Sequence, residues 1–455
     1  MSVAVVGGGL AGASAALALA EAGLEIVSVA AAPGATALSA GTLDVASASP
    51  GIPTLPWRDA LRGSPLLPRE RLALHRRGAG SHPYAQLFGA AEGGERPLRE
   101  VEAATTRLAA WLAPHGVDLV GSLGENRLLP TMAGTLHVAD HAFRPAADAD
   151  LLTASALAVV ELPGLEGFDG RALARTLTRE IEVLGLPARS VHVVHAKLPE
   201  GLLADGRPAG VAARLDAGEA QAALASACAG LVEPGTVLLF PPVLGMTESR
   251  AVASAVAEAS GARVAEALAF PPHALAGFRL QRALDAALEA AGVRRRHGRV
   301  RRVHGADDGP LRLVLEGEAP DVEADAVVLA TGRYVSGGLS ADPDAVNEPL
   351  AGLPLFDADG RRIDGIPARR SARKGYSNEQ PLYSAGVRTD RRLRPIAANG
   401  RPGHARLFAA GDLLGGFDPA RERTGLGVAL LTGLGAANAV LETLRTPLGR
   451  SGDVP

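Results

Sequence analysis

Three glycines near the start of the chain have the spacing of a phosphate-binding loop. Gly7, Gly9 and Gly12 fit the pattern G-x-G-x-x-G and lie between a β-branched run and an Ala/Leu-rich run. In such a loop the first glycine permits a tight turn, the second lets the backbone approach a phosphate, and the third lets the helix pack closely on the strand. The amides at the helix N-terminus then hold the phosphate. The pattern predicts a cofactor site with contacts from Gly7, Gly9, Leu10, Ala11 and Gly12.

Three later segments favour a flavin over a nicotinamide as that cofactor. Asp412 comes just after the apolar run 407–410, where its carboxylate can accept hydrogen bonds from ribityl hydroxyls. Gly425 precedes a predicted helix, whose positive N-terminal end would stabilise the negative charge that develops at N1/O2 of a reduced flavin. Residues 330–332 form a predicted strand-to-turn position that lets the backbone pass near the cofactor. The predicted contacts are Thr331, Gly332, Gly411, Asp412, Gly425 and Gly427.

One expected residue is missing from the predicted site. A carboxylate about 20 residues after the glycines usually binds the ribose 2′-OH. That place is taken by Ala30, which is followed by Ala31 and Ala32. Either another group holds the ribose, or the adenosine half of the cofactor is bound weakly or is absent. The choice between FAD and FMN therefore stays open.

The hydrophobic pattern predicts the elements that must position these motifs. Short β-branched runs are typical of buried parallel strands, and the Ala/Leu-rich run after the glycines is typical of a helix. The predicted strands are 3–6, 26–29, 327–329 and 407–410, and the predicted helices at the two chain ends are 11–22 and 427–444. A Pro/Gly-rich stretch at 48–68 predicts a loop that leads out of the first unit.

Strands and helices at both chain ends flank a long insert, which predicts a discontinuous nucleotide-binding domain. The predicted fold class is α/β, with a Rossmann-like flavin-binding domain around a central parallel sheet, interrupted by a second α+β domain. The predicted flavin-binding domain comprises residues 1–62, 283–345 and 398–447, the substrate or cap domain comprises 63–282 and 346–397, and 448–455 form a flexible tail.

Composition narrows the classes of function. The 46 Lys+Arg residues against 49 Asp+Glu give a net charge of −3, which argues against nucleic acid as the main partner. The single cysteine, Cys228, excludes an intrachain disulfide and a thiolate-bound cluster, so any iron–sulfur carrier must belong to another chain. The uncharged N-terminal stretch lacks a positive n-region, and no other stretch predicts a membrane span. The chain is predicted to be cytoplasmic, with membrane contact only through a partner.

Two histidines are candidate metal ligands by spacing alone. His137 and His141 stand four residues apart, but no carboxylate triad surrounds them, and their neighbours predict a loop without a metal. Asp140 and His141 could form an acid–base pair, yet nothing in the sequence places them beside the flavin. No residue is assigned as the catalytic base. Six arginines between 294 and 302 predict an exposed strand edge.

The glycine loop and the three later segments, in this order, resemble the flavoprotein superfamily with the glutathione-reductase-type fold. A closer resemblance is to the B subunit of anaerobic glycerol-3-phosphate dehydrogenase: Leu38-Ser39-Ala40-Gly41-Thr42-Leu43-Asp44 resembles the S-S/A-G-S/T-L-D segment of that family. Further similar segments, in the same order along the chain, are 277–281, 332–339, 386–390, 393–395 and 414–419. Residues 420–427 depart from the family, which tends towards a cysteine-bearing run there, so no thiol role is predicted.

The resemblance implies a peripheral flavoprotein subunit of a three-subunit respiratory enzyme. That enzyme oxidises sn-glycerol 3-phosphate to dihydroxyacetone phosphate (glycerone phosphate) and passes electrons towards menaquinone. The implied partners are a separate FAD-containing catalytic subunit and an iron–sulfur, membrane-associated subunit, which would hold this chain at the inner face of the cell membrane. The family is commonly assigned FMN, whereas the intact glycine loop is compatible with FAD.

Two sets of residues are candidates for further contacts. Ser39, Gly41 and Thr42 could face the flavin ring or its phosphate, or could form a capping turn. Arginines can bind a phosphorylated substrate through bidentate pairing, although most arginines in an arginine-rich chain are surface or structural residues. The predicted substrate residues are Arg279, Arg333, Arg388 and Arg394.

Three functions are compatible with the sequence. The chain could take part directly in glycerol-3-phosphate oxidation, or it could be an electron-transfer and assembly module whose sister subunit oxidises the substrate. It could also be a stand-alone FAD-dependent oxidoreductase of another small substrate, because a fold does not determine a substrate.

Overall fold

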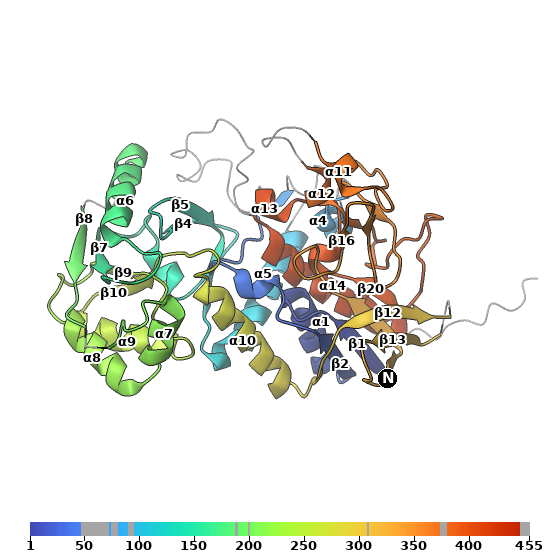
Figure 1. The fold of residues 1–455 in the computed structure, drawn as a ribbon, viewed down its shortest axis with the longest axis horizontal. Coiled ribbons are helices and arrows are strands. Elements are labelled where there is room, and N and C mark those ends of the chain that lie inside the picture. The colour runs from blue at the N-terminus through green and yellow to red at the C-terminus, as the bar shows by residue number, and fades with distance from the viewer. Residues whose placement is uncertain are drawn as a thin grey trace, which may run out of the picture. The chain divides into compact units, whose positions relative to one another are not determined.

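The computed structural model describes residues 1–46, 72–73, 81–89, 95–186, 190–198, 201–306, 309–373 and 380–445. Its contacts divide the chain into two units, each built from separate stretches of sequence (Figure 1). The first unit comprises Met1–Ala35, Leu72–Ala104 and Leu284–Pro455, and the second comprises Thr36–Arg71 and Thr105–Ala283.

A five-stranded parallel sheet forms the centre of the first unit. Its strand order is β11-β2-β1-β15-β20, so strands from both ends of the chain lie side by side. Its strands are β1 (Ser2–Val6), β2 (Glu25–Ala30), β11 (Arg294–His297), β15 (Ala326–Leu329) and β20 (Leu407–Ala409). The central strands are almost wholly buried, as is usual for parallel strands covered on both faces.

Two apolar helices pack together against this sheet. Helix α1 (Leu10–Glu21) is buried over its first ten residues, and α14 (Gly425–Arg445) packs along it (Figure 1). A Cβ atom at Gly433 of α14 would lie 2.4 Å from the carbonyl oxygen of Ala11, so only glycine permits this close approach. Helix α14 is long and apolar enough to cross a membrane, but 61% of its most apolar window is buried inside the protein, as in a core helix.

Shorter elements complete the first unit. An antiparallel sheet has the order β12-β13-β14, and two further antiparallel pairs are β16–β17 and β18–β19. These elements are α4 (Pro83–Phe88), β12 (Val300–Gly305), β13 (Leu311–Leu315), β14 (Val322–Ala324), β16 (Ser340–Ala341), β17 (Val346–Asn347), β18 (Leu355–Phe356), α11 (Ala368–Ser371), α12 (Pro381–Ser384), β19 (Gly386–Val387), η4 (Gly411–Leu413) and α13 (Pro419–Glu422). Helix α5 (Arg96–Leu112) is divided between the two units.

The second unit has a four-stranded parallel sheet of order β10-β9-β7-β8. Antiparallel pairs β3–β6 and β4–β5 accompany it. The elements are η1 (Ala35–Leu38), η2 (Ala113–His115), β3 (Leu119–Gly121), β4 (Arg127–Pro130), β5 (Leu136–Ala139), β6 (His141–Phe143), η3 (Ala146–Ala149), β7 (Ala156–Glu161), α6 (Gly170–Leu184), β8 (Ser190–His195), α7 (Pro208–Leu215), α8 (Gly218–Cys228), β9 (Val237–Phe240), α9 (Ser249–Ser260) and β10 (Arg263–Glu266). Helix α10 (Leu275–Ala290) is divided between the two units.

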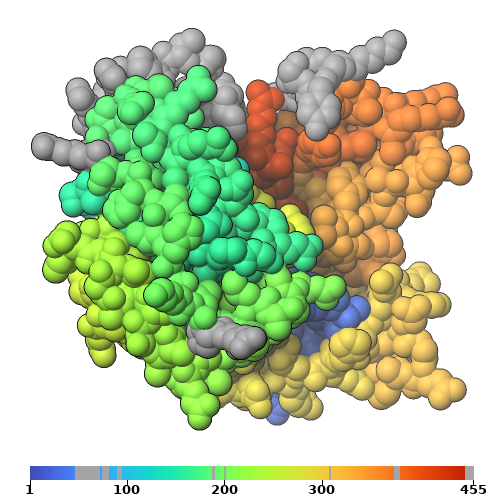
Figure 2. Space-filling view, turned by 60° about the vertical axis from the view of Figure 1, so that its left-hand side comes forward, coloured from blue at the N-terminus to red at the C-terminus, as the bar shows by residue number. Residues whose placement is uncertain are grey.

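The predicted α/β class with a central parallel sheet is confirmed, and the predicted strands and helices of the first unit form within one or two residues of the expected bounds. The arginine-rich run is an exposed strand edge as predicted: β11 is the outer strand, Arg294 and Arg295 are exposed, and Figure 2 shows residues near 300, in yellow, at the surface. The predicted loop at 48–68 and the predicted tail at 448–455 lie outside the described residues.

Two expectations differ from the structure. The sequence predicts a loop for His137 and His141, but they lie on the short strands β5 and β6, because pairing with β4 and β3 supplies the ladder that their local sequence does not signal. The predicted cap domain includes residues 346–397, whereas the contacts of those residues group them with the first unit. The domain division as a functional statement stays a prediction.

Candidate functional site

The glycine loop joins β1 to α1 with no room for side chains. Gly7 has φ +127°, and a Cβ there would lie 2.1 Å from the carbonyl oxygen of Ala330. A Cβ at Gly12 would lie 2.2 Å from the carbonyl oxygen of Gly7, so the helix starts directly against the turn. Gly9 is the N-cap of α1 and offers no side chain to its first amides. The loop therefore has the tight turn that phosphate binding requires, and the N-cap residue makes no side-chain hydrogen bond at the start of the helix.

The loop after β2 packs against this turn. A Cβ at Gly34 would lie 2.5 Å from Cα of Gly9, and one at Gly8 would lie 2.9 Å from the carbonyl oxygen of Ala32. Ala30, at the end of β2, supplies no carboxylate. The structure thus brings backbone rather than an acidic side chain to the place where a ribose is usually bound.

The turn after β15 is equally tight. Gly332 has φ +70°, and a Cβ at Gly338 would lie 2.0 Å from the carbonyl oxygen of Gly332. The hydroxyl oxygen Oγ1 of Thr331 is buried and has no hydrogen-bond partner in the described part of the chain. This turn adjoins the glycine loop, since the Cβ position of Gly7 lies 3.2 Å from the backbone nitrogen of Thr331.

The segment after β20 is anchored to α14. The amide of Gly411 donates a hydrogen bond to Oγ1 of Thr432 at 2.8 Å, and that hydroxyl donates to the carbonyl of Val428 at 2.6 Å. Gly411 has φ +71°, and its Cβ position lies 2.7 Å from Cβ of Ala11, so the segment also meets α1. Asp412 follows Gly411 on η4, with its side chain 35% exposed and its atom Oδ1 buried.

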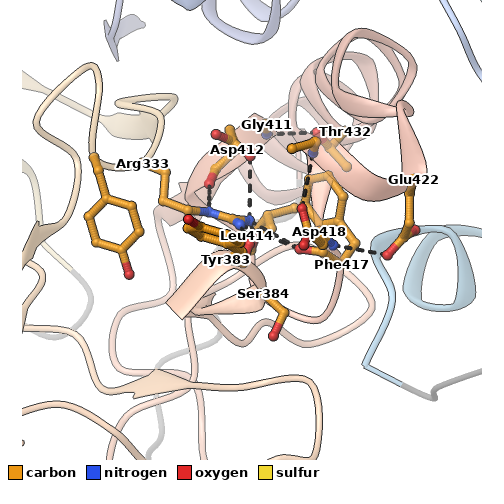
Figure 3. A network of polar contacts seen from close by, with 12 residues as sticks. Arg333, Tyr383, Ser384, Gly411, Asp412, Leu414, Phe417, Asp418, Glu422 and Thr432 are labelled. Atoms are coloured by element: carbon orange, nitrogen blue, oxygen red, sulfur yellow. Dashed lines mark hydrogen bonds and ion pairs between the residues drawn. The ribbon is translucent and has the colours of Figure 1, made fainter. Parts of the chain in front are cut away.

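Arg333 fastens this segment through backbone carbonyls (Figure 3). Its Nε donates to the carbonyl of Asp412 at 3.1 Å, and its Nη2 donates to the carbonyl of Leu414 at 2.9 Å. Further carbonyl acceptors of the same guanidinium are those of Tyr383 and Phe417. The guanidinium carbon also lies 5.2 Å from the centre of the Phe417 ring. The residue is 5% exposed, and all three of its nitrogens are bonded.

Asp418 and Glu422 complete the network at α13. The Asp418 carboxylate caps α13 by accepting from the amides of Ala420 and Arg421. Glu422 accepts from the Asp418 amide at 2.9 Å, and its other oxygen lies 3.1 Å from Nε2 of His82. Nδ1 of His82 accepts from the Tyr84 amide, so Nε2 carries the proton that bonds Glu422.

Several buried polar atoms at this end of the sheet have no hydrogen bond within the described chain. They are Oγ1 of Thr331, Oδ1 of Asp412 and Oγ1 of Thr424, which stands directly before α14 and is 0% exposed. Buried polar atoms are rarely left without partners, so such a group of them indicates room for a polar ligand. Together with the glycine loop they fit the phosphate, ribityl and ring portions of a flavin.

The remaining predicted cofactor residues, Ser39, Gly41 and Thr42, belong to the second unit. Oγ of Ser39 accepts from the Gly41 amide and donates to the Thr42 carbonyl, which are the contacts of a local turn. Residues 41–43 then run antiparallel beside β6, where the Leu43 amide donates to the His141 carbonyl. Their role toward a flavin stays a prediction.

Beside them lies a buried cluster of two Asp–His pairs. Oδ2 of Asp44 accepts from Oγ1 of Thr42 at 2.9 Å and lies 3.0 Å from Nε2 of His137. Asp140 is fully buried, and Nδ1 of His141 lies 2.7 Å from its Oδ1. Burial raises the pKa of the Asp44 carboxyl, while the His137 imidazole opposes that rise.

The four predicted substrate arginines have different surroundings. Arg279 is buried and forms a bidentate ion pair with Glu266, at 2.6 and 3.1 Å, so its charge is already matched. Arg394 is ion-paired with Asp390 at 2.7 Å, and Arg333 is bonded as described above. Arg388 is exposed, lies over the Phe356 ring and has no carboxylate partner within the described chain.

Sequence reasoning missed Thr424 and the Asp44–His137 pair. Thr424 could have been found, since a threonine directly before a predicted helix is a common N-cap. Its hydroxyl makes no capping bond here, which no local signal predicts. The Asp44–His137 pair could not have been found from spacing, because the two residues are 93 positions apart. Asp140 and His141 are adjacent in the sequence, which offers them as a pair, and they do contact each other. Cys228 is buried as predicted, and burial raises the pKa of its thiol to about 11.

Comparison with known proteins identifies relatives along nearly the whole chain. The family model described as FAD binding domain matches residues 2–428. The probable anaerobic glycerol-3-phosphate dehydrogenase B subunit of Halobacterium salinarum is 31% identical, with 97% of this chain and 98% of the relative covered. The anaerobic glycerol-3-phosphate dehydrogenase B subunit of Pectobacterium atrosepticum is 30% identical, with the same coverage.

Solved structures align over most of the chain but less closely. The alignment with the 3-ketosteroid-Δ4-(5α)-dehydrogenase of Rhodococcus jostii RHA1 covers 96% of this chain and 96% of that chain, at 15% identity and a TM-score of 0.37. A likeness at that level indicates nothing about the substrate.

Proposed function

The chain belongs to the FAD binding domain family and, within it, to the family of the B subunit of anaerobic glycerol-3-phosphate dehydrogenase; from this membership we propose that its first unit holds a flavin and takes part in the oxidation of glycerol 3-phosphate. The observation that carries the proposal is the meeting of the glycine loop with buried, unbonded polar atoms at the same edge of the parallel sheet. Ligands of open α/β sheets bind outside the carboxyl ends of the strands, which is where these groups lie.

Each part of this edge suits a different part of the cofactor. The N-terminus of α1, where the N-cap Gly9 makes no side-chain hydrogen bond, would hold a phosphate. The Asp412 carboxylate would accept from ribityl hydroxyls, with Thr331 beside the turn after β15. Thr424 and the first amides of α14 would face the N1/O2 edge of the ring, where a positive helix end is favourable. A bound flavin supplies acceptance of a hydride or of single electrons.

The family bears on the choice between FAD and FMN. The matched family model is an FAD binding domain, and the glycine loop is built for a phosphate tail. Ala30 and the backbone of Ala32 offer no carboxylate for an adenosine ribose, which leaves FMN compatible with the same site. Denaturing release and mass measurement of the yellow chromophore distinguish the two.

The assembly is the finer part of the proposal. The relatives are each named as one subunit of a dehydrogenase, so the chain is one subunit of a larger enzyme. We propose that its partners are an FAD-containing catalytic subunit and an iron–sulfur, membrane-associated subunit, with menaquinone as acceptor, and that it lies at the inner face of the membrane through them. Support comes from Cys228, which is alone and buried, so this chain cannot hold a cluster itself.

Substrate contact is proposed for arginine. Of the predicted residues, Arg388 has the guanidinium most open to a phosphate, whereas Arg279 and Arg394 are matched by carboxylates. Because a guanidinium binds phosphate in a bidentate manner, Arg388 is the first choice within the first unit.

A second candidate function is an electron-transfer module whose sister subunit oxidises the substrate. The bonding of the two histidines that are buried in the described part of the first unit, His82 and His404, favours this second function. Both ring nitrogens of each are engaged: His82 with Glu422 and the Tyr84 amide, His404 with the Ala306 carbonyl and the Arg406 amide. Neither is open to take a hydroxyl proton, as direct oxidation requires.

Anaerobic titration of the flavin-loaded chain with glycerol 3-phosphate separates the two functions. Bleaching of the flavin by substrate in the isolated chain is expected for direct oxidation. If bleaching needs the sister subunit, the chain is a relay. A chain that binds neither FMN nor FAD after careful preparation contradicts both functions.

A further inference from the structure

The buried guanidinium of Arg333 has two kinds of partner. Four of its hydrogen-bond acceptors are backbone carbonyls, from Tyr383, Asp412, Leu414 and Phe417, and carbonyls do not neutralise a positive charge. Its one described carboxylate neighbour is Asp412, whose Oδ1 lies 3.4 Å from Nη2. A buried cation needs a compensating anion, and Asp412 is that anion.

The Asp412 carboxylate depends on Arg333 in turn. Its Oδ1 is buried and accepts no hydrogen bond within the described chain, so it lacks the donors that normally stabilise a buried carboxylate. Burial raises the pKa of the Asp412 carboxyl; the Arg333 charge lowers it, and the Asp418 charge raises it further. An ionised carboxylate has only acceptors, whereas a protonated one presents a donor to an incoming hydroxyl.

We propose, on the premise that the first unit binds a flavin, that Arg333 is a positioning residue that keeps Asp412 ionised and aimed at the hydroxyl groups of the cofactor. Its carbonyl bonds fix the backbone of residues 411–417, and its charge fixes the protonation state of the side chain. This assigns Arg333 to the cofactor rather than to the phosphorylated substrate.

The charged side chains that act on the Asp412 carboxyl are those of Arg333 and Asp418. Helices α1 and α14 meet η4 with apolar and small residues, and their charged residues stand at the far C-terminal ends. Strand β19 carries none. Of the other ionisable neighbours, Asp418 is an anion that caps α13, and Glu422 is bonded to His82. Tyr334 bonds the Leu382 carbonyl, and burial raises the pKa of its hydroxyl.

The test compares three variants of the full chain, Arg333→Met, Arg333→Lys and Asp412→Asn, with Arg406→Met as the matched control. Arg406 is a half-buried arginine of the same unit that donates to one carbonyl, that of Asp325, at 3.4 Å. After removal of the flavin, the dissociation constants of FMN and FAD are measured by flavin fluorescence between pH 5.5 and 8.5. Asp412 is followed separately in the apoprotein by ¹³C-carboxyl NMR, with Asp412→Asn for assignment.

Arg333→Met is expected to weaken flavin binding about tenfold, the worth of a hydrogen bond to a charged group, and to make the affinity fall as the pH falls. Arg333→Lys keeps the charge and is expected to bind flavin more weakly than wild type. Its affinity is expected not to change with pH, and the same independence of pH is expected for wild type and for Arg406→Met. Asp412→Asn is expected to bind flavin weakly, with an affinity that does not change with pH. In the NMR titration, Arg333→Met is expected to move the ionisation of Asp412 to higher pH.

Two results overturn the proposal. Loss of affinity in Arg333→Met that is equal at every pH shows a merely structural role, and an unchanged Asp412 titration shows that Arg333 does not set its charge. The NMR result needs no flavin, so it decides the inference even if the chain binds none. Absence of flavin binding in wild type, by contrast, contradicts the proposed function alone.

Discussion

Asp412 in the first unit, whose side chain is 35% exposed, and the buried Asp44 in the second unit have different charged neighbours. Burial raises the pKa of Asp412 in the first unit and of Asp44 in the second. The group that opposes this rise is the Arg333 guanidinium at Asp412 and the His137 imidazole at Asp44. A guanidinium is a lasting cation and suits a carboxylate whose ionised form has to act on a ligand. An imidazole can share a proton with a carboxylate inside a fold.

The hydrogen bonds around the two regions differ in the same way. In the second unit, Asp140 is closed by its own protein: it accepts from the amides of Val45 and Ala46 and pairs with His141. In the first unit, Thr331, Asp412 and Thr424 each keep a buried oxygen that makes no hydrogen bond in the described part of the chain, although the oxygen of Asp412 is ion-paired with Arg333. Asp44 of the second unit also has one buried oxygen, Oδ1, that makes no hydrogen bond in the described part of the chain, so the satisfied group there is Asp140 with His141. A satisfied polar pair stabilises a fold, whereas unsatisfied atoms beside a glycine loop indicate room for a ligand.

The largest expected effect concerns the glycine loop. Gly12→Ala places a Cβ 2.2 Å from the Gly7 carbonyl oxygen and forces α1 away from β1. We expect flavin retention to be lost and the free energy of unfolding to fall by about 3 kcal/mol, the upper range for overpacking. The flavin-to-protein absorbance ratio and urea unfolding measure the two effects.

Gly218→Ala is the matched control for Gly12→Ala. Gly218 begins α8, and its Cβ would meet nothing within 4 Å. Alanine there is expected to leave flavin content unchanged and to stabilise the chain slightly, because alanine favours helices over glycine. A yellow, stable Gly12→Ala protein would show that the first unit does not use this loop as described.

How much of this site the sequence predicts depends on how local the contacts are. Gly7 and Gly12 act within one turn of chain, so the spacing predicts both the βαβ unit and the tight loop. The bonds of Arg333 reach acceptors 50 to 84 residues away, and no local pattern reports that its charge is used inside the protein. The sequence therefore predicts Arg333 as a substrate residue for its charge alone.

The second unit is harder to predict for the same physical reason. Strands β5 and β6 are four and three residues long and are held by pairing with β4 and β3, so their sequence lacks a full alternating pattern. Residues 41–46 pack beside β6 from about 95 positions away. Short strands stabilised by distant partners give the least local signal, which is why the sequence predicts a loop for His137 and His141.

A smaller effect is expected at Asp140 of the second unit, whose carboxylate is fully bonded within the protein. Asp140→Asn keeps the shape of the side chain but replaces one acceptor oxygen by a donor, which then faces an amide or the His141 ring. We expect the free energy of unfolding to fall by about 2 kcal/mol, the cost of an unsatisfied buried group. Urea unfolding followed by tryptophan fluorescence measures it, because Trp111 lies in this unit.

Asp118→Asn is the matched control for Asp140→Asn. Asp118 forms a partly exposed ion pair with Arg250, at 2.6 Å, in the same unit. Removing a pair of that kind is expected to cost less than about 1 kcal/mol. Equal losses in the two variants would mean that the buried cluster is no more closely satisfied than the surface, and the contrast between the two units would fail.

The smallest expected effect is a pH dependence at Asp44. Because the folded state holds this proton to higher pH than the unfolded state, it binds more protons between the two pKa values, and its contribution to the free energy of unfolding falls as the pH rises. Asp44→Asn cannot ionise at this position. The free energy of unfolding of wild type minus that of the variant is therefore expected to decrease as the pH rises from the range of an ordinary aspartate towards neutrality.

The exposed Asp205 of the same unit is the control and gives the opposite sign, because its hydrogen bond from Arg214 lowers its pKa. For Asp205→Asn the difference is expected to increase as the pH rises through the range of an ordinary aspartate. A difference for Asp44→Asn that rises with pH, as for Asp205→Asn, would mean that the folded state holds Asp44 ionised, as Arg333 is proposed to hold Asp412. The contrast between the two aspartates would then be lost.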